Sequence, residues 1–282
     1  MTMAEPLARP HSAREQLPRR AAPVTVFTVL HAEWIKYRTL VSYPLTTVAV
    51  LVLIVGMGLL GAFSLVWNAD AGPAVGAGAA SALPPGQFLD GMQYAYVLLG
   101  ILAVVFTASE YTQATMQPSL LAAPKRIPVL AAKAGLMGLV GLVVGAIGSS
   151  IVLFVVPGLL SGVEFTVDDS PAGIARVIVG SGVSLALMGM LAVGLAALIR
   201  SLVAGFITVV VLLTVAPIAL SAVPVEWVAK LMVYLPTVVG SQYLSPDPTA
   251  TIVDPWWGLV ILAGWALALL VAGGLTLRYR DA

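Results

Sequence analysis

Residues 177–222 read VIVGSGVSLALMGMLAVGLAALIRSLVAGFITVVVLLTVAPIALSA and contain a single charged residue, Arg200. A transmembrane helix needs about 20 apolar residues to cross a ~30 Å hydrocarbon core, so this run is too long for one crossing. We expect the chain to reverse at Arg200 and Ser201 in a tight hairpin between two crossings. The stretch therefore predicts a helical protein that crosses a membrane several times.

The composition of the whole chain agrees with this prediction. Of its 282 residues, 60% are hydrophobic and 10% are charged, whereas a soluble domain carries about 25% charged residues. We predict an all-α polytopic fold in one domain, residues 24–282, after a disordered cytoplasmic tail, residues 1–23. Six apolar runs supply the predicted spans: 44–66, 92–109, 134–160, 174–199, 202–222 and 256–277.

The distribution of positive charge predicts the orientation, since Lys and Arg resist translocation across the membrane. Of the 14 Lys and Arg residues, only Arg176 and Lys230 fall on the side opposite the N terminus. We therefore expect both termini to be cytoplasmic and the protein to lie in the cell membrane. A net charge of +1 gives no reason to expect nucleic acid as a partner.

An amphipathic helix is predicted between the tail and the first span. Apolar and aromatic side chains recur at three- and four-residue steps along one face: Phe27, Leu30, Trp34, Tyr37 and Val41. Glu33, Lys36 and Thr39 fall on the opposite side, and Lys36 and Arg38 are placed to reach lipid phosphates. We expect this helix to lie at the membrane surface; a helix packed on a cytosolic partner is the alternative.

Two external connections are longer than a turn. Residues 68–91, rich in Ala, Gly and Pro, are expected to form a flexible loop. Residues 223–236, VPVEWVAKLMVYLP, predict a helix too short to span, with Glu226 and Lys230 as an i,i+4 pair and Pro236 at its end. We expect this segment to be interfacial or re-entrant in the outer leaflet.

The sequence lacks the residues that several kinds of catalytic and metal site require. The chain has no cysteine, no GxxxxGK[ST] phosphate-binding loop and no HExxH motif, and its two histidines, His11 and His31, precede the first span. We therefore predict no catalytic site, no metal site and no cofactor bound by this chain. The predicted spans carry Glu110, Lys133 and Arg176 only near their ends, which disfavours a proton-driven transporter.

The spans are rich in small residues. Gly135, Gly138, Gly141, Gly145 and Gly148 recur along the third span, and Gly180, Ser184 and Gly189 continue the pattern in the fourth. Small residues let membrane helices approach closely, so we expect tight packing here.

Four segments together carry a resemblance to a known family. They are EWIKYRT at 33–39; the cytoplasmic connection after the second span, with EYTQAT at 110–115, LLAAPKR at 120–126 and AAK at 131–133; YLPT at 234–237; and residues 255–282, which begin PWWGLVILAGWALALL. Their order and spacing resemble the ABC type-2 transporter permeases, in particular those of actinobacterial type.

The resemblance implies the membrane half of an ATP-driven transporter, in this family mostly exporters. Such a subunit works as a dimer, homodimeric or heterodimeric, with a separate ATPase subunit that binds ATP and Mg. It also implies that Glu33, Trp34, Lys36 and Arg38 lie in a connecting helix at the membrane surface. Glu226, Lys230 and Pro236 fall in the external re-entrant segment.

By the same resemblance, the connection after the second span corresponds to the elbow that docks on the ATPase. Its matching positions are Glu110, Tyr111, Thr115, Leu120, Pro124, Lys125 and Arg126. The chain departs from the family pattern at Ala114, where members carry glycine, and at Gln113 and Gln117, where basic residues are usual. The alternative interpretation of Lys125 and Arg126 is that they are ordinary anchors at the cytoplasmic face.

Two other functional classes share these features of hydropathy. One is a polytopic scaffold or assembly factor without transport activity, and the other is a transporter or channel driven by an ion gradient. The transported substrate is not indicated by any motif.

Overall fold

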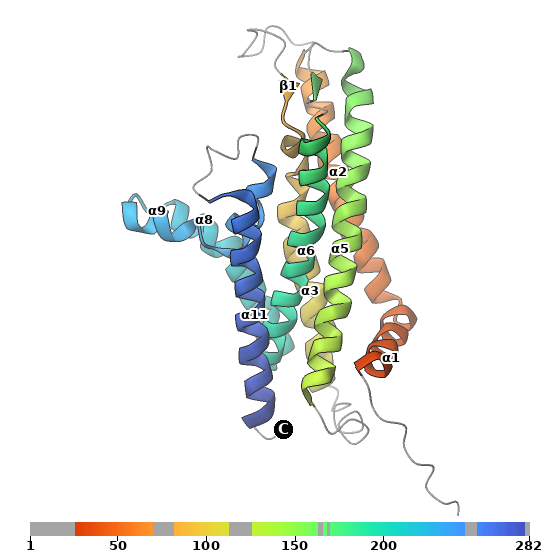
Figure 1. The fold of residues 1–282 in the computed structure, drawn as a ribbon, viewed down its shortest axis with the longest axis vertical. Coiled ribbons are helices and arrows are strands. Elements are labelled where there is room, and N and C mark those ends of the chain that lie inside the picture. Colours follow the sequence, from red (N-terminus) through yellow and green to blue (C-terminus); the bar gives the residue numbers. More distant parts are fainter. Residues whose placement is uncertain are drawn as a thin grey trace, which may run out of the picture.

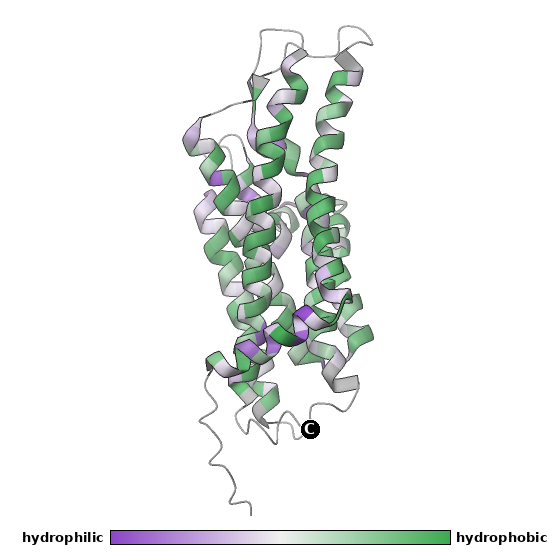
Figure 2. Cartoon of the chain, turned by 90° about the vertical axis from the view of Figure 1, so that its right-hand side faces the viewer, coloured by the Kyte–Doolittle hydropathy of each residue, from purple (hydrophilic) through white to green (hydrophobic). Residues whose placement is uncertain are grey.

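The computed structural model describes residues 26–69, 82–112, 126–162, 166–167, 170–245 and 253–279. Long helices run side by side, and α1 lies across one end of them, which we call the α1 end (Figures 1 and 2). Figure 2 shows the long helices mainly in the colours of hydrophobic residues. The elements are α1 Val26–Thr39, α2 Ser42–Ala69, β1 Ala82–Leu83, η1 Pro85–Leu89, α3 Gly91–Thr112, α5 Arg126–Leu159, η2 Leu160–Gly162, β2 Thr166–Val167, α6 Pro171–Ile199, α7 Leu202–Val210, η3 Val211–Val215, α8 Ala216–Ser221, α9 Glu226–Met232, α10 Pro236–Gly240, η4 Gln242–Leu244 and α11 Pro255–Tyr279.

Six helical segments of the described chain are long and apolar enough to cross a membrane, which confirms the all-α, multi-pass prediction. They are Ser42–Trp67, Pro85–Ser109, Ile127–Leu159, Pro171–Ile199, Leu202–Ser221 and Pro255–Leu277. The second and third spans begin earlier than predicted, at Pro85 and Ile127 rather than at 92 and 134. The third can do so because Pro128 lies in the first turn of α5, where a missing N–H breaks no helical bond.

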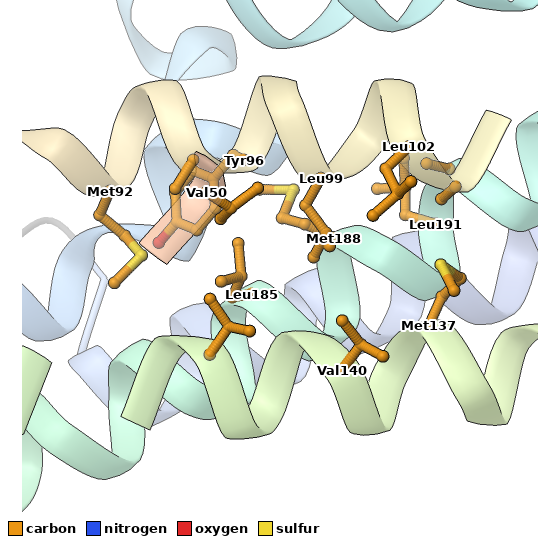
Figure 3. Packing of buried hydrophobic residues seen from close by; sticks show 14 of the residues in the cluster. Val50, Met92, Tyr96, Leu99, Leu102, Met137, Val140, Leu185, Met188 and Leu191 are labelled. Carbon is orange, nitrogen blue, oxygen red and sulfur yellow. The ribbon is translucent and has the colours of Figure 1, made fainter. Parts of the chain in front are cut away.

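The fourth span, α6, is the centre of the bundle. It packs against α5, α11 and α3. Of the 18 most apolar consecutive residues in α6, 72% are buried, compared with 17% in the fifth span. Figure 3 shows apolar side chains of α3, α5 and α6 meeting in this core, including Leu99, Met137, Leu185 and Met188. The fifth span instead lies at the edge of the bundle.

Glycines bring α5 against α6, as their spacing predicted. A Cβ atom added at Gly141 would lie 2.6 Å from the Leu185 carbonyl oxygen, and one at Gly145 would lie 2.5 Å from that of Ser181. Both distances are shorter than van der Waals contact. The two helices therefore touch through their backbones, and this contact requires glycine.

The predicted hairpin between the fourth and fifth spans is present. Arg200 caps α6 in the left-handed conformation, with φ 59°, and is the only non-glycine residue with positive φ in the described ranges. The Ser201 side chain accepts a hydrogen bond from the Ala204 N–H and so caps α7. Arg200 Nη2 also donates to the carbonyl of Thr276 on α11, which fixes the hairpin against the last span.

The connection after the first span is more ordered than predicted. We expected residues 68–91 to be one flexible loop, but α2 continues to Ala69 and residues 82–91 form β1, η1 and the start of α3. Leu89 is fully buried and Phe88 nearly so, and Ala82 pairs in parallel with Thr166. Burial of these two apolar side chains orders the second half of the connection. The rest of it, like the predicted tail, lies outside the described residues.

Candidate functional site

Three regions hold the site residues that the sequence predicted. Glu33, Trp34, Lys36 and Arg38 all lie on α1. Of the elbow, Glu110 and Tyr111 lie at the end of α3 and Arg126 begins α5, whereas Thr115, Leu120, Pro124 and Lys125 lie outside the described residues. Glu226 and Lys230 lie on α9, and Pro236 begins α10.

The face of α1 that packs on the bundle includes Glu33. Glu33 and Tyr37 are buried, at 8% and 5% exposure, whereas Phe27, Trp34 and Val41 are exposed. Because α1 packs mainly on α5, a polar residue that meets its partner there is turned inward. The prediction that Glu33 faces away from the apolar side of α1 is therefore wrong.

The partner of Glu33 is a lysine on α5. The Nζ atom of Lys133 lies 2.8 Å from Oε2 of Glu33, and the two side chains are only 2% and 11% exposed. A charge buried at this depth is tolerated only when it is paired, so each residue holds the other in place. This ion pair links α1 to the first turns of α5.

An aromatic cluster lies beside Lys133. The ring of Phe106, on α3, lies 4.5 Å from the Lys133 ammonium, within the range of a cation–π interaction. Tyr37 and Tyr43 each meet Phe106 edge to face, with ring centroids 6.2 and 5.2 Å away. The Tyr37 hydroxyl also hydrogen-bonds to Thr47, and burial raises the pKa of Tyr37 above its ordinary value. We call this set, Glu33, Tyr37, Tyr43, Thr47, Phe106 and Lys133, the α1 junction.

Lys133, which the sequence placed only near the end of a span, is buried. Lys133 lies inside the third span, which starts at Ile127 rather than at 134. The exposed residues of this part of α5 are Ala131, Gly135 and Leu139, at four-residue steps, and Lys133 lies on the other side of the helix. The sequence signal that could have found it is a lone lysine at core spacing from Leu130 and Met137.

The α1 junction has a defined relation to the elbow. Phe106 lies six residues before the end of α3 at Thr112, and Lys133 lies seven residues after the start of α5 at Arg126. The elbow begins in the last turn of α3 and ends at the first residue of α5, so the α1 junction joins these two helices to each other through α1. A displacement of the elbow that separated α3 from α5 would have to break these contacts.

A second buried polar cluster lies in the core, and the sequence did not point to it. The Tyr96 hydroxyl, on α3, lies 2.9 Å from Ser184 Oγ on α6, 2.9 Å from the Gly240 carbonyl oxygen on α10, and 3.3 Å from the Tyr243 hydroxyl on η4. All four residues are buried. We call these residues the Tyr96 cluster.

The external segment carries the predicted pair in an exposed place. Lys230 Nζ lies 2.8 Å from Glu226 Oε1, with side chains 74% and 85% exposed. This i,i+4 pair confirms the predicted contact, but solvent screening leaves it little energetic weight. Among the residues that the structure describes, no group of three His, Asp or Glu side chains is placed to hold a metal ion.

Compared with known protein families and with curated proteins, the sequence matches none of them.

Proposed function

We propose that this chain is the permease subunit of an ATP-binding-cassette transporter of the type-2 kind. In this proposal it forms the substrate pathway of an exporter as a dimer, and a separate subunit binds ATP and Mg. Both termini then face the cytoplasm, and the α1 end carries the ATPase. The resemblance of its four segments to that family and the six apolar spans support the proposal.

The observation that carries the proposal furthest is the α1 junction. A permease without its own ATPase needs a part at the cytoplasmic end that converts motion of a partner into motion of its spans. The buried ion pair of Glu33 and Lys133, with Phe106 beside it, ties α1 to both helices that frame the elbow. Packed side chains and ion pairs of this kind can carry mechanical coupling between sites.

The proposed mechanism is alternating access. ATP binding closes the two ATPase subunits and draws the two elbows together. Each elbow then moves α3 and α5 with α1 as one body, because the α1 junction holds them together. The dimer's central pathway changes its opening from the cytoplasmic to the external side.

A pull-down in mild detergent from the native host tests this function. The tagged chain is expected to bring a P-loop ATPase in stoichiometric amount, with ATPase activity in the purified complex. Reversal of charge at Lys125 and Arg126 together is expected to weaken the association, whereas Lys230→Glu, on the exposed α9, is the matched control and should retain it. Repeated isolation without an ATPase would favour a scaffold, and flux that needs an ion gradient but no ATP would favour a secondary transporter.

A further inference from the structure

The Tyr96 cluster joins a segment late in the chain to the middle of the bundle. Tyr96 lies on α3 and Ser184 on α6, whereas Gly240 and Tyr243 belong to the short elements α10 and η4 that precede the last span. A hydroxyl has one proton to donate, so the Tyr96 hydroxyl donates to either Ser184 or the Gly240 carbonyl while accepting from Tyr243. The hydrogen bonds of this one side chain thus hold α10 and η4 against two spans.

Close packing also holds α10 and η4 in place. A Cβ atom at Gly180 of α6 would overlap the ring of Tyr243, so the ring lies directly on the α6 backbone. Val239 and Gly240 are buried, and α10 also packs on α11. The segment Pro236–Leu244 is therefore seated inside the bundle rather than on its surface.

The chain leading to this segment has a built-in irregularity. The fifth span changes to a π-helix over Val211–Val215, next to Pro217. Pro217 has no N–H to bond the Leu213 carbonyl four residues earlier, and Gln93 Nε2 on α3 donates to that carbonyl at 3.3 Å. Gln93 lies one turn before Tyr96, so α3 holds both the irregular turn and the seated segment.

The chain between the π-helix at Val211–Val215 and the segment Pro236–Leu244 is mostly exposed. Every residue from Ser221 to Leu231 is exposed except Val228, and α9 projects sideways from the bundle in Figure 1. Segments with few buried contacts are the ones that open at low free-energy cost. Residues 221–231 therefore have few contacts to break when they are displaced, and they run from the fifth span to the segment that Tyr96 holds.

We propose that α10 and η4, Pro236–Leu244, form a gate that the Tyr96 hydroxyl latches shut and that the π-turn at Val211–Val215 hinges. Tyr96 is a positioning residue in this device, since it acts by holding the gate. Its purpose rests on the transport function proposed above, where the gate would close one end of the pathway. Cysteine labelling reads only the position of the gate, so it gives a result whether or not an ATPase partner exists.

The absence of cysteine from the sequence makes the labelling simple. Thr237→Cys places a reporter on the gate at a residue 1% exposed whose hydroxyl has no hydrogen-bond partner among the described residues, so the substitution removes no contact of that group. Ser149→Cys places a second reporter at a fully buried site on α5, outside the segment Pro236–Leu244. Each is reacted with a water-soluble maleimide in nanodiscs, which leave both faces of the membrane accessible.

Tyr96→Phe removes only the latching hydroxyl. We expect it to raise the labelling rate of Thr237→Cys about tenfold, the change that loss of one or two hydrogen bonds of ordinary net strength would produce. Labelling of Ser149→Cys should not change. Tyr94→Phe is the matched control, because Tyr94 is 55% exposed on the same helix, and it should leave both rates unchanged.

Pro217→Ala tests the hinge by restoring an N–H within reach of the Leu213 carbonyl. We expect slower labelling of Thr237→Cys, since a regular helix would stiffen the turn. Equal labelling rates with and without the Tyr96→Phe substitution would overturn the latch, and so would a parallel rise at both reporters, which would show general loosening. An unchanged rate in Pro217→Ala would overturn the hinge.

Discussion

Lys133 Nζ lies 2.8 Å from Glu33 Oε2 in a buried ion pair between residues 100 positions apart in the chain. Lys230 and Glu226 form an ion pair of the same length four residues apart on the exposed α9. The N–O distance is the same in the two pairs, whereas their burial differs. This difference allows the role of burial to be measured within one protein.

Neutralising Glu33 should destabilise the protein strongly. Glu33→Gln leaves the Lys133 ammonium buried without its counter-charge, and loss of one partner of such a pair costs about 3–5 kcal/mol. Glu226→Gln breaks the exposed pair and should cost no more than about 0.5 kcal/mol. Thermal unfolding of the two variants in the same detergent measures the difference, and equal melting temperatures would contradict the described burial.

Replacing both charges should separate stability from coupling. The double variant Glu33→Leu, Lys133→Met removes the buried charges together, and such replacements are often neutral or stabilising. We expect its melting temperature to recover relative to Glu33→Gln. Under the proposed function, we expect both variants to impair the ATPase activity of a reconstituted complex with the partner subunit; full activity in the double variant would show that the ion pair serves stability alone.

Phe106 should matter more than another phenylalanine of the spans. Phe106→Leu removes the cation–π contact with Lys133 and the edge contacts with two tyrosine rings, for a loss of about 1–3 kcal/mol. Phe63→Leu is the control, since Phe63 is 58% exposed on α2. Chemical denaturation of both variants checks the prediction, which fails if Phe63→Leu proves the more damaging.

Replacing two different glycines of α5 with alanine should change stability in opposite directions. Gly141→Ala would push a methyl group against the Leu185 carbonyl oxygen and force α5 from α6, which we expect to destabilise the bundle. Gly135→Ala meets nothing within 4 Å and should stabilise by about 0.5–1 kcal/mol, because alanine favours the helix. The order of their melting temperatures is the measurement; a stable Gly141→Ala variant would reject the close contact.

Much of the fold could be predicted from the sequence because helix length and hydropathy are local properties. The six spans, the reversal at Arg200 and the close approach at Gly141 and Gly145 all followed from runs of residues and their spacing. The order of residues 82–91 did not follow, since their Ala, Gly and Pro content resembles that of a loop. Burial of Phe88 and Leu89 by the surrounding helices orders them.

The number of apolar spans and their approximate limits follow from the order of the amino acids alone. Which face of each helix turns inward depends on the three-dimensional packing. In a membrane protein the lipid is as apolar as the core, so an apolar stripe does not reveal which side faces the protein. Glu33 and Lys133 became buried partners, and Tyr96 came to hold the segment before the last span, because helices far apart in sequence meet there.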